Sequence, residues 1–160
     1  MSKYYLHLGS NTGDRLSMLS TAISSIESKI GKVMDKSSIY ETEPWGLKEQ
    51  EHFLNQAIIV DTELTVEEVF GITKDIEKEM GSIKSVQWGP RAIDIDILYA
   101  DHLVMDTPTL KIPHPQLYHR NFVLIPLMEI AGDFVDPLKN MSIDEIYDVC
   151  EDEGEVLILD

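Results

Sequence analysis

The sequence predicts one α+β domain, a sandwich of helices against a mainly antiparallel sheet. The chain has 160 residues, 43% of them hydrophobic, enough for one core but too few for two comfortable domains, so 1–160 is expected to be a single domain. Apolar residues recur at helical spacing in two segments and form strand-like runs in four others. Their order is strand, helix, strand, strand, helix, strand, which is the ferredoxin-like order.

The first strand is expected at 4–9, and the first helix follows the small-residue turn 9–14. Phosphate loops also lie between a strand and a helix, but the Gly-Lys-Ser/Thr ending of such a loop is absent here. A tight turn in which Asn11 or Asp14 caps the helix is the simpler interpretation, with Arg15 decorating the helix start. The predicted buried face comprises Leu16, Leu19, Ile23, Ile26 and Ile30.

The second and third strands are expected at 33–40 and 54–62, with a loop between them. A second helix begins after Thr65, whose hydroxyl can cap it while Glu68 completes a capping box. Gly81 ends this helix. Its predicted buried face comprises Val66, Val69, Phe70, Thr73, Ile76 and Met80.

The fourth strand is expected at 92–99. Closely spaced prolines then exclude long regular elements until 122–131, a short helix that Pro126 is expected to break. A helix at 144–150 and a last strand at 156–159 complete the chain. We expect the helices on one face of the sheet.

The chain is strongly acidic: 13 basic against 29 acidic residues give a formal net charge of −16. Nucleic acid and anionic membranes need a basic footprint, so neither is expected as a partner. The same field repels a polyphosphate, so a phosphate site would need positive charge from a metal or from arginine. The chain has only three arginines, Arg15, Arg91 and Arg120, and arginine suits bidentate phosphate recognition.

Cysteine content and hydropathy predict a cytoplasmic protein. The one cysteine, Cys150, excludes an internal disulfide, and the first residues lack the apolar core of a signal peptide. The longest apolar stretch, 122–128, is far shorter than the about 20 residues of a membrane span. A reducing compartment and no membrane crossing are therefore expected.

The fourth strand carries the most informative pair, Asp94 and Asp96. Side chains alternate along a strand, so both carboxylates share one face, with Cα atoms about 7 Å apart. Such a pair can be an ordinary solvent face, but aspartate suits strand interiors poorly and two like charges need a partner. A divalent cation fits, and Mg²⁺ is preferred over zinc because no Cys or His cluster has ligand spacing. Arg91, just before the pair, adds a group suited to phosphate.

Other polar residues are compatible with ligand binding. His114 lies between two prolines and shortly before Arg120 in a stiff loop, although a structural histidine is as consistent with that setting. Asn55 offers a donor and an acceptor on one edge, which can read an amide-like heterocycle. The aromatic residues near these motifs suit core packing as well as stacking. They are Trp45, Phe53, Trp88 and Phe122.

The run from Trp88-Gly89-Pro90-Arg91 to Asp94 and Asp96 is the most specific motif of the chain. Further motifs are Leu8 to Arg15, Tyr40-Glu41-Thr42 with Pro44 and Gly46, Phe53-Leu54-Asn55, and Pro113-His114-Pro115 with Arg120. In this order the motifs resemble the 6-hydroxymethyl-7,8-dihydropterin pyrophosphokinase family of folate biosynthesis, in register from about residue 4 to residue 131. That resemblance also implies a ferredoxin-like α+β fold.

The resemblance implies a monomeric, magnesium-dependent transferase that moves a diphosphate from ATP to the hydroxymethyl group of the pterin and releases AMP. Asp94 and Asp96 would hold two Mg²⁺ ions, either could accept the hydroxyl proton, and Arg91 would complete the catalytic set. The implied pterin residues are Thr42, Glu43, Trp45, Phe53, Asn55, Trp88 and Phe122. The implied nucleotide residues are Glu77, Lys84, Arg91, Ile97, Lys111, His114 and Arg120.

One segment departs from the family pattern. The family usually has a loop with several basic residues before Trp88, whereas 82–87 carries only Lys84, with Ser82 and Gln87 where arginines are expected. Lysine lacks the planar fork of arginine, so weak nucleotide affinity, a slow rate, or both are predicted. Two alternatives stay open: a pterin- or nucleotide-binding module that has lost catalysis, and an acidic interaction domain.

Overall fold

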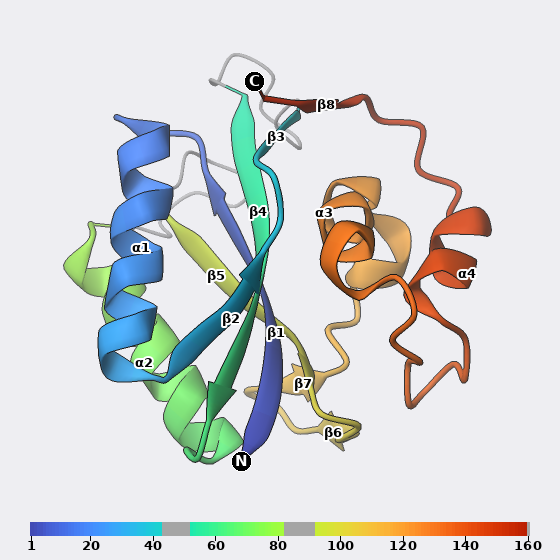
Figure 1. Ribbon diagram of the computed structural model, residues 1–160, viewed down its shortest axis with the longest axis horizontal. Helices are drawn as coiled ribbons and strands as arrows, with labels where there is room; N and C mark the ends of the chain where they lie inside the picture. The colour runs from blue at the N-terminus through green and yellow to red at the C-terminus, as the bar shows by residue number, and fades with distance from the viewer. Residues whose placement is uncertain (43–51, 82–91, 160) are drawn as a thin grey trace.

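A six-stranded sheet lies between two layers of helices (Figure 1). The computed structural model describes residues 1–42, 52–81 and 92–159. In chain order the elements are β1 Ser2–Ser10, α1 Arg15–Lys29, β2 Lys32–Lys36, β3 Tyr40–Thr42, β4 Phe53–Thr62, α2 Val66–Glu79, β5 Asp94–Ala100, β6 Met105–Asp106, β7 Lys111–Ile112, the 3₁₀ helix η1 Leu117–His119, α3 Asn121–Ala131, α4 Ile143–Asp148 and β8 Val156–Ile158.

The sheet order is β5-β1-β4-β3-β8, with β2 also on β4, and every pairing is antiparallel. Strand β1 lies between β4 and β5, which confirms the predicted ferredoxin-like order. The strand predicted at 33–40 is instead two strands, β2 and β3. Between them the backbone N–H of Ser38 donates to the carboxylate of Glu129 on α3, at 3.0 and 3.1 Å, which draws the chain off the ladder.

The capping predictions for both long helices are confirmed. Asp14 accepts from the backbone N–H of Ser17 at 3.2 Å, and Thr65 forms the expected capping box at the start of α2. The buried stripe of α1 runs through Leu19, Ala22 and Ile26. Leu16 lies at the edge of that stripe and is 52% exposed, so its predicted burial is wrong.

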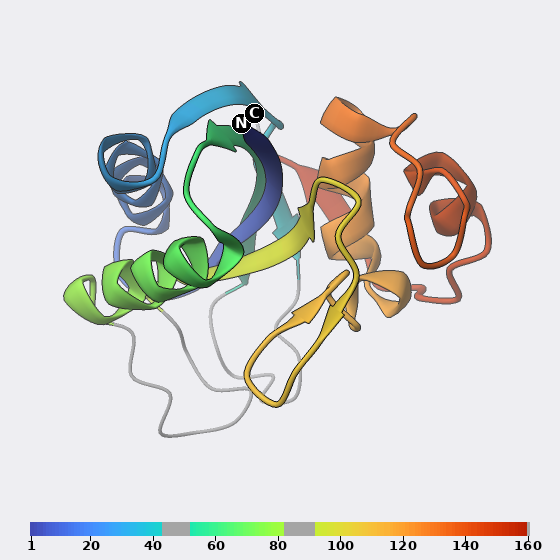
Figure 2. The same ribbon diagram turned by 90° about the horizontal axis from the view of Figure 1, so that it is seen from below.

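Helices cover both faces of the sheet, so the prediction that they lie on one face is wrong (Figures 1 and 2). Helices α1 and α2 pack on one face, and α3 and α4 cover the other. Strand β1 has apolar residues on both sides, because Leu6 and Leu8 join the α1/α2 core while Tyr5 joins the core under α3 and α4. Two apolar faces need two helical layers.

Helix α3 also continues through Pro126, contrary to the predicted break. Proline removes one backbone donor, the N–H that would bond to the carbonyl of Phe122 four residues earlier. The His7 ring lies under the first turn of this helix, with its centroid 6.0 Å from that of Phe122. Packing of α3 on β4 buries the helix and stabilises it despite the missing donor.

Candidate active site

One end of the sheet face under α3 is polar. Residues paired directly across antiparallel strands share a face. The row formed by Tyr5 and Ile59 belongs to the apolar core. The two rows beyond it are His7 with Ala57 and Asp96, and Gly9 with Asn55 and Asp94.

Both strand aspartates point to this face, as their spacing predicts. The side chain of Asp96 is 35% exposed, and Asp94 is likewise half-buried. Ile93 and Ile95 are buried on the opposite side, in the α1/α2 core. The alternation of β5 therefore separates two carboxylates that solvent can reach from a closed apolar surface.

Glu77 of α2 fixes the backbone between the two aspartates. Its carboxylate is 3% exposed and accepts from the backbone N–H of Ile95 at 2.7 Å. It also pairs with Lys74 at 3.2 Å. Because β5 is an edge strand, this bond satisfies a donor that no neighbouring strand can reach. Glu77, expected near the nucleotide, thus contacts the strand rather than an open surface.

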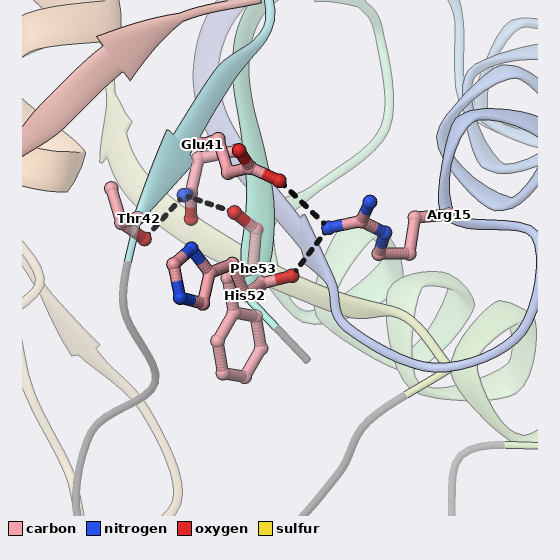
Figure 3. A network of polar contacts seen from close by, with 6 residues as sticks. Arg15, Glu41, Thr42, His52 and Phe53 are labelled. Carbon is pink, nitrogen blue, oxygen red and sulfur yellow. Dashed lines mark hydrogen bonds and ion pairs between the residues drawn. The ribbon is translucent and has the colours of Figure 1, made fainter. Parts of the chain in front are cut away.

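The predicted pterin residues Thr42 and Phe53 lie together at the polar end (Figure 3), and Asn55 is two residues further along β4. Asn55 is 1% exposed and donates through Nδ2 to the Thr42 hydroxyl at 2.9 Å. Gly9 lies next to these side chains, and a Cβ there would be 3.6 Å from both Asn55 Oδ1 and Phe53 Cδ1. The bond to Thr42 holds the buried amide with its edge in a fixed direction.

Arg15 has a contact that the sequence analysis missed. Its Nη1 donates to Glu41 Oε2 at 3.1 Å and to the carbonyl of His52 at 2.8 Å (Figure 3). Glu41 precedes Thr42 in β3, and His52 precedes Phe53 in β4. Arg15 therefore joins the start of α1 to the ends of the two strands that present the predicted pterin residues.

His7 lies beneath Phe122, the first-turn aromatic residue of α3. The two ring centroids are 6.0 Å apart at an interplanar angle of 62°. Burial lowers the pKa of His7 to about 4, with Arg120 also lowering it while Asp96 and the Phe122 backbone oppose the shift. Nε2 of His7 finds no hydrogen-bond partner among the described residues. A neutral imidazole therefore lies in the middle of the polar face, and no motif or spacing in the sequence indicated this residue.

Arg120 brings positive charge to the two aspartates. Burial lowers the pKa of its guanidinium, while the carboxylates of Asp96, Asp94 and Asp152 oppose that shift. Its Cζ lies 5.6 Å from the ring centroid of Phe122, within cation–π range. Arg120, predicted to bind phosphate, and Phe122, predicted to stack on the pterin, are therefore neighbours.

His114, in the loop between β7 and η1, is a second neighbour of Asp96. Its Nε2 is 3.9 Å from Asp96 Oδ1, and its backbone N–H donates to the carbonyl of Leu98 at 3.1 Å. Burial lowers the pKa of His114; Arg120 adds to this shift and Asp96 opposes it. The imidazole is thus mostly neutral near pH 7 and can act as a hydrogen-bond donor or acceptor.

A pocket of about 300 Å³ opens beside β5, between α2 and the β6–β7 ribbon. It includes three predicted nucleotide residues, Ile97, Lys111 and His114, together with Asp96. Sequence reasoning missed the rest of the lining, because these side chains converge only through the packing of separate elements. They are Phe70, Lys74, Ile95, Thr107, Pro108, Thr109, Leu110 and Pro115.

Several predicted residues lie outside the described part of the chain. They are Glu43, Trp45, Ser82, Lys84, Gln87, Trp88 and Arg91. Within 1–42, 52–81 and 92–159, no group of three or more His, Cys, Asp or Glu side chains could hold a metal ion. Two carboxylates on one face fit Mg²⁺, which commonly takes one or two carboxylates and completes its shell with phosphate and water.

The family model for 7,8-dihydro-6-hydroxymethylpterin-pyrophosphokinase matches residues 5–132. The chain belongs to this family. It is accordingly a pyrophosphokinase of folate biosynthesis, and the expected transfer of diphosphate from ATP to hydroxymethyldihydropterin is the activity of the family. The match includes every predicted site residue and ends before residues 133–160, the acidic C-terminal tail.

Curated relatives carry the corresponding enzyme name. The chain is 41% identical over 136 residues to the 2-amino-4-hydroxy-6-hydroxymethyldihydropteridine pyrophosphokinase of Methylorubrum extorquens, covering 84% of this chain and 86% of that protein. It is 43% identical over 128 residues to the enzyme of the same name from Bacillus subtilis, covering 79% of this chain and 77% of that one.

The fold also matches solved structures. A crystal structure of Plasmodium falciparum HPPK-DHPS with pteroate superposes with a TM-score of 0.77 at 18% identity, covering 92% of this chain and 42% of that one. The crystal structure of an HPPK-DHPS in complex with substrates gives a TM-score of 0.75, also at 18% identity, with coverages of 92% and 43%. The pyrophosphokinase thus spans about two fifths of these solved chains, and this likeness shows the fold.

Proposed function

We propose that the polar end of the α3-side face is the active site of this pyrophosphokinase. Asp96 carries the proposal, because it shares a face with the predicted pterin residues and also lines the pocket beside β5. A carboxylate at the junction of two sites is suited to a transfer between them. The reacting hydroxyl would lie on the sheet face, and the triphosphate would enter from the pocket.

The pocket beside β5 would take the nucleotide. Lys74 and Lys111 at its rim, with 39% and 55% of their side chains exposed, would meet phosphates despite the acidic whole-chain field. His114 would donate to a phosphate oxygen, and Arg120 would face the phosphates from the α3 side. Such a site acts by positioning and neutralising the triphosphate rather than by covalent chemistry.

The sheet face would hold the pterin. Asn55 would read the amide edge of the ring, since the Thr42 hydroxyl already fixes the orientation of the carboxamide. Phe53 and Phe122 would stack on the ring, and Glu43, Trp45 and Trp88 are proposed to complete this side. Arg120 above the Phe122 ring would link this half to the phosphate half.

Asp94 and Asp96 are the residues that would hold Mg²⁺, proposed as two ions. When bound, the metal would supply positive charge to the phosphate oxygens that become more negative during transfer. Either carboxylate can accept the proton of the pterin hydroxyl, because both are half-exposed on the face where the pterin is proposed to bind. Arg91 is proposed to add a planar cation beside them.

The proposal further takes the chain as one monomeric, cytoplasmic domain with no membrane or nucleic-acid partner. Among the described helices, none combines the length and apolarity of a membrane span. Light scattering on purified protein tests the oligomeric state. A monomer mass is expected, and a concentration-independent dimer mass would contradict it.

The function is tested by mixing the protein with ATP, Mg²⁺ and 6-hydroxymethyl-7,8-dihydropterin and measuring AMP and the pterin diphosphate in equal amounts. Omission of the pterin should abolish AMP formation. Folded protein that makes no AMP would contradict the proposal. Calorimetric pterin binding in such a sample would favour a binding module, and binding of neither ligand would favour an acidic interaction domain.

A further inference from the structure

The acidic C-terminal tail contacts both sides of the proposed pterin site. We propose that Asp152–Ile158 is a positioning strap, which fixes the first turn of α3 relative to β3 and thereby sets the affinity for the pterin. Asp152 and Asn121 are its positioning residues. The inference rests on the proposed function, but its geometry can be tested separately. It concerns a segment that lies beyond the matched family region, 5–132.

Asp152 caps α3 from a distance. The residue at the N-cap of α3, Arg120, makes no side-chain capping bond of its own. Instead, Asp152 Oδ2 accepts from the backbone N–H of Asn121, the first residue of the helix, at 3.0 Å. A carboxylate at this end also matches the positive end of the helix dipole. A residue 31 positions downstream therefore supplies the cap that the helix lacks locally.

Asn121 completes the contact from the helix side. Its Nδ2 donates to the carbonyl of Gly154 at 2.6 Å and to that of Asp152 at 3.3 Å. The second oxygen of Asp152 accepts from the Gly154 N–H at 2.8 Å, which folds the tail into a tight turn at this point. Asn121 is 7% exposed, so its two side-chain bonds are partly buried.

The other end of the strap is a strand. β8 pairs antiparallel with β3, with Thr42 opposite Val156 and Tyr40 opposite Ile158. The N–H of Leu159 donates to the carbonyl of Ile39 at 2.8 Å and extends the pairing by one residue. β3 therefore lies between β4 and β8 (Figure 1), and the tail covers the edge of β3 that would otherwise be exposed.

The two anchor points flank the proposed pterin residues. Phe122 follows Asn121 in the first turn of α3, and Thr42 lies in β3 opposite the start of β8. A segment bonded to both holds the aromatic ring and the sheet face in one relative position. Asp152 also acts electrostatically on Arg120, so the strap links to the phosphate side through charge. Loss of the strap should affect the pterin first, because both hydrogen-bonded anchors are on that side.

Steady-state kinetics and hydrogen exchange test the strap in the full chain. For Asp152→Ala we expect KM for the pterin to rise about tenfold, the effect of losing one helix cap, with KM for ATP changed less than about twofold. In the same variant, amide exchange in the first turn of α3 and in β3 should be faster than in the wild type, measured without ligand. Asn121→Ala, which cuts the contact from the other side, should reproduce both effects.

Two matched variants separate the hydrogen bonds from charge and from general tail effects. Asp152→Asn keeps an oxygen that can cap the helix, so its pterin KM should stay within about threefold of wild type. Glu153→Ala removes a carboxylate from the next, exposed position of the same tail and should leave pterin KM and amide exchange unchanged.

The outcomes distinguish the strap from the proposed function. Unchanged exchange in Asp152→Ala would overturn the strap, whatever the activity. Faster exchange with equal loss of affinity for both substrates would overturn its coupling to the pterin, leaving a structural contact. If the wild type makes no AMP, the function fails. Equilibrium binding of 6-hydroxymethylpterin then decides the strap, because Asp152→Ala should weaken binding and Glu153→Ala should not.

Discussion

Asp136 and Asp96 both belong to the α3 side of the molecule, but they have opposite surroundings. Asp136 has no exposed surface, and its carboxylate is surrounded by donors. It joins the end of β5 to η1 and to the loop after α3. Its donors are the hydroxyls of Tyr99 at 2.5 Å and Tyr118 at 2.7 Å, and the backbone N–H groups of Leu138 and Lys139 at 2.7 Å each.

Asp96, in contrast, keeps 35% of its side chain exposed, and its ion-pair partner His114 is 3.9 Å away, beyond hydrogen-bond distance. The saturated carboxylate is at the apolar end of the face and the open one is at the polar end. A buried charge is tolerated only when donors satisfy it, whereas a carboxylate that must meet a ligand keeps its oxygens accessible. The difference separates a structural aspartate from a functional one.

The largest expected effect is on turnover at the open end. Asp96→Asn should lower kcat about a thousandfold, because the amide removes the negative charge that would hold the metal. The melting temperature should change little, since no donor is left unpaired in the core. Asp75→Asn, on the exposed side of α2, is the matched control and should be neutral. Unchanged AMP formation in Asp96→Asn would remove this residue from the chemistry.

At the closed end we expect the reverse. Asp136→Asn should cost roughly 3 kcal/mol of unfolding free energy, because an amide has a single acceptor oxygen for these donors and brings its own N–H groups. Urea denaturation measures the loss, and pterin KM per folded molecule should stay within about twofold. Asp133→Asn, exposed just after α3, is the control. A stable Asp136→Asn protein with lost activity would reverse the comparison.

His7 lies between the apolar and polar ends of the sheet face, and its protonation should make the free energy of unfolding depend on pH. Its folded-state pKa of about 4 is below the ordinary value of 6.5, so the unfolded chain binds more protons between these values. Its contribution to stability is present above pH 6.5 and is lost as the pH falls toward 4, by up to about 3 kcal/mol.

Urea unfolding of metal-free protein from pH 7.5 to 4 checks this dependence. In His7→Leu the decline over that range should be shallower than in the wild type. His119→Leu replaces an exposed histidine and should leave the slope unchanged. Identical slopes for His7→Leu and the wild type would mean that the imidazole is not held neutral in the folded state.

The smallest expected effect concerns the contact that joins α1 to the open end. Arg15→Met removes the Nη1 donor that bonds to both Glu41 and the His52 carbonyl. Pterin KM should rise about fivefold, with KM for ATP unchanged, because only the ends of β3 and β4 are released. Lys29→Met, which removes a surface pair with Glu79, is the control. Equal effects from both variants would rule out a specific role for Arg15.

Periodicity explains which predictions hold. The order of the elements, the capping box at Thr65 and the shared face of Asp94 and Asp96 follow from local rules of spacing and hydrogen bonding, and all three are confirmed. The break at Pro126 was wrong because α3 packs on β4, a strand that is distant in sequence, and this packing stabilises the helix across the proline. A local rule cannot include that packing.

By itself, the sequence determined the element order, the pair of strand aspartates and, through its ordered motifs, the pyrophosphokinase family. Tertiary structure alone decided that helices cover both faces, that Arg15 and Glu77 hold the strands of the site, and that the tail caps α3 through Asp152. The physical reason is range. Side-chain alternation and helix capping act within a few residues, whereas a cap supplied from 31 residues downstream exists only once both segments have packed.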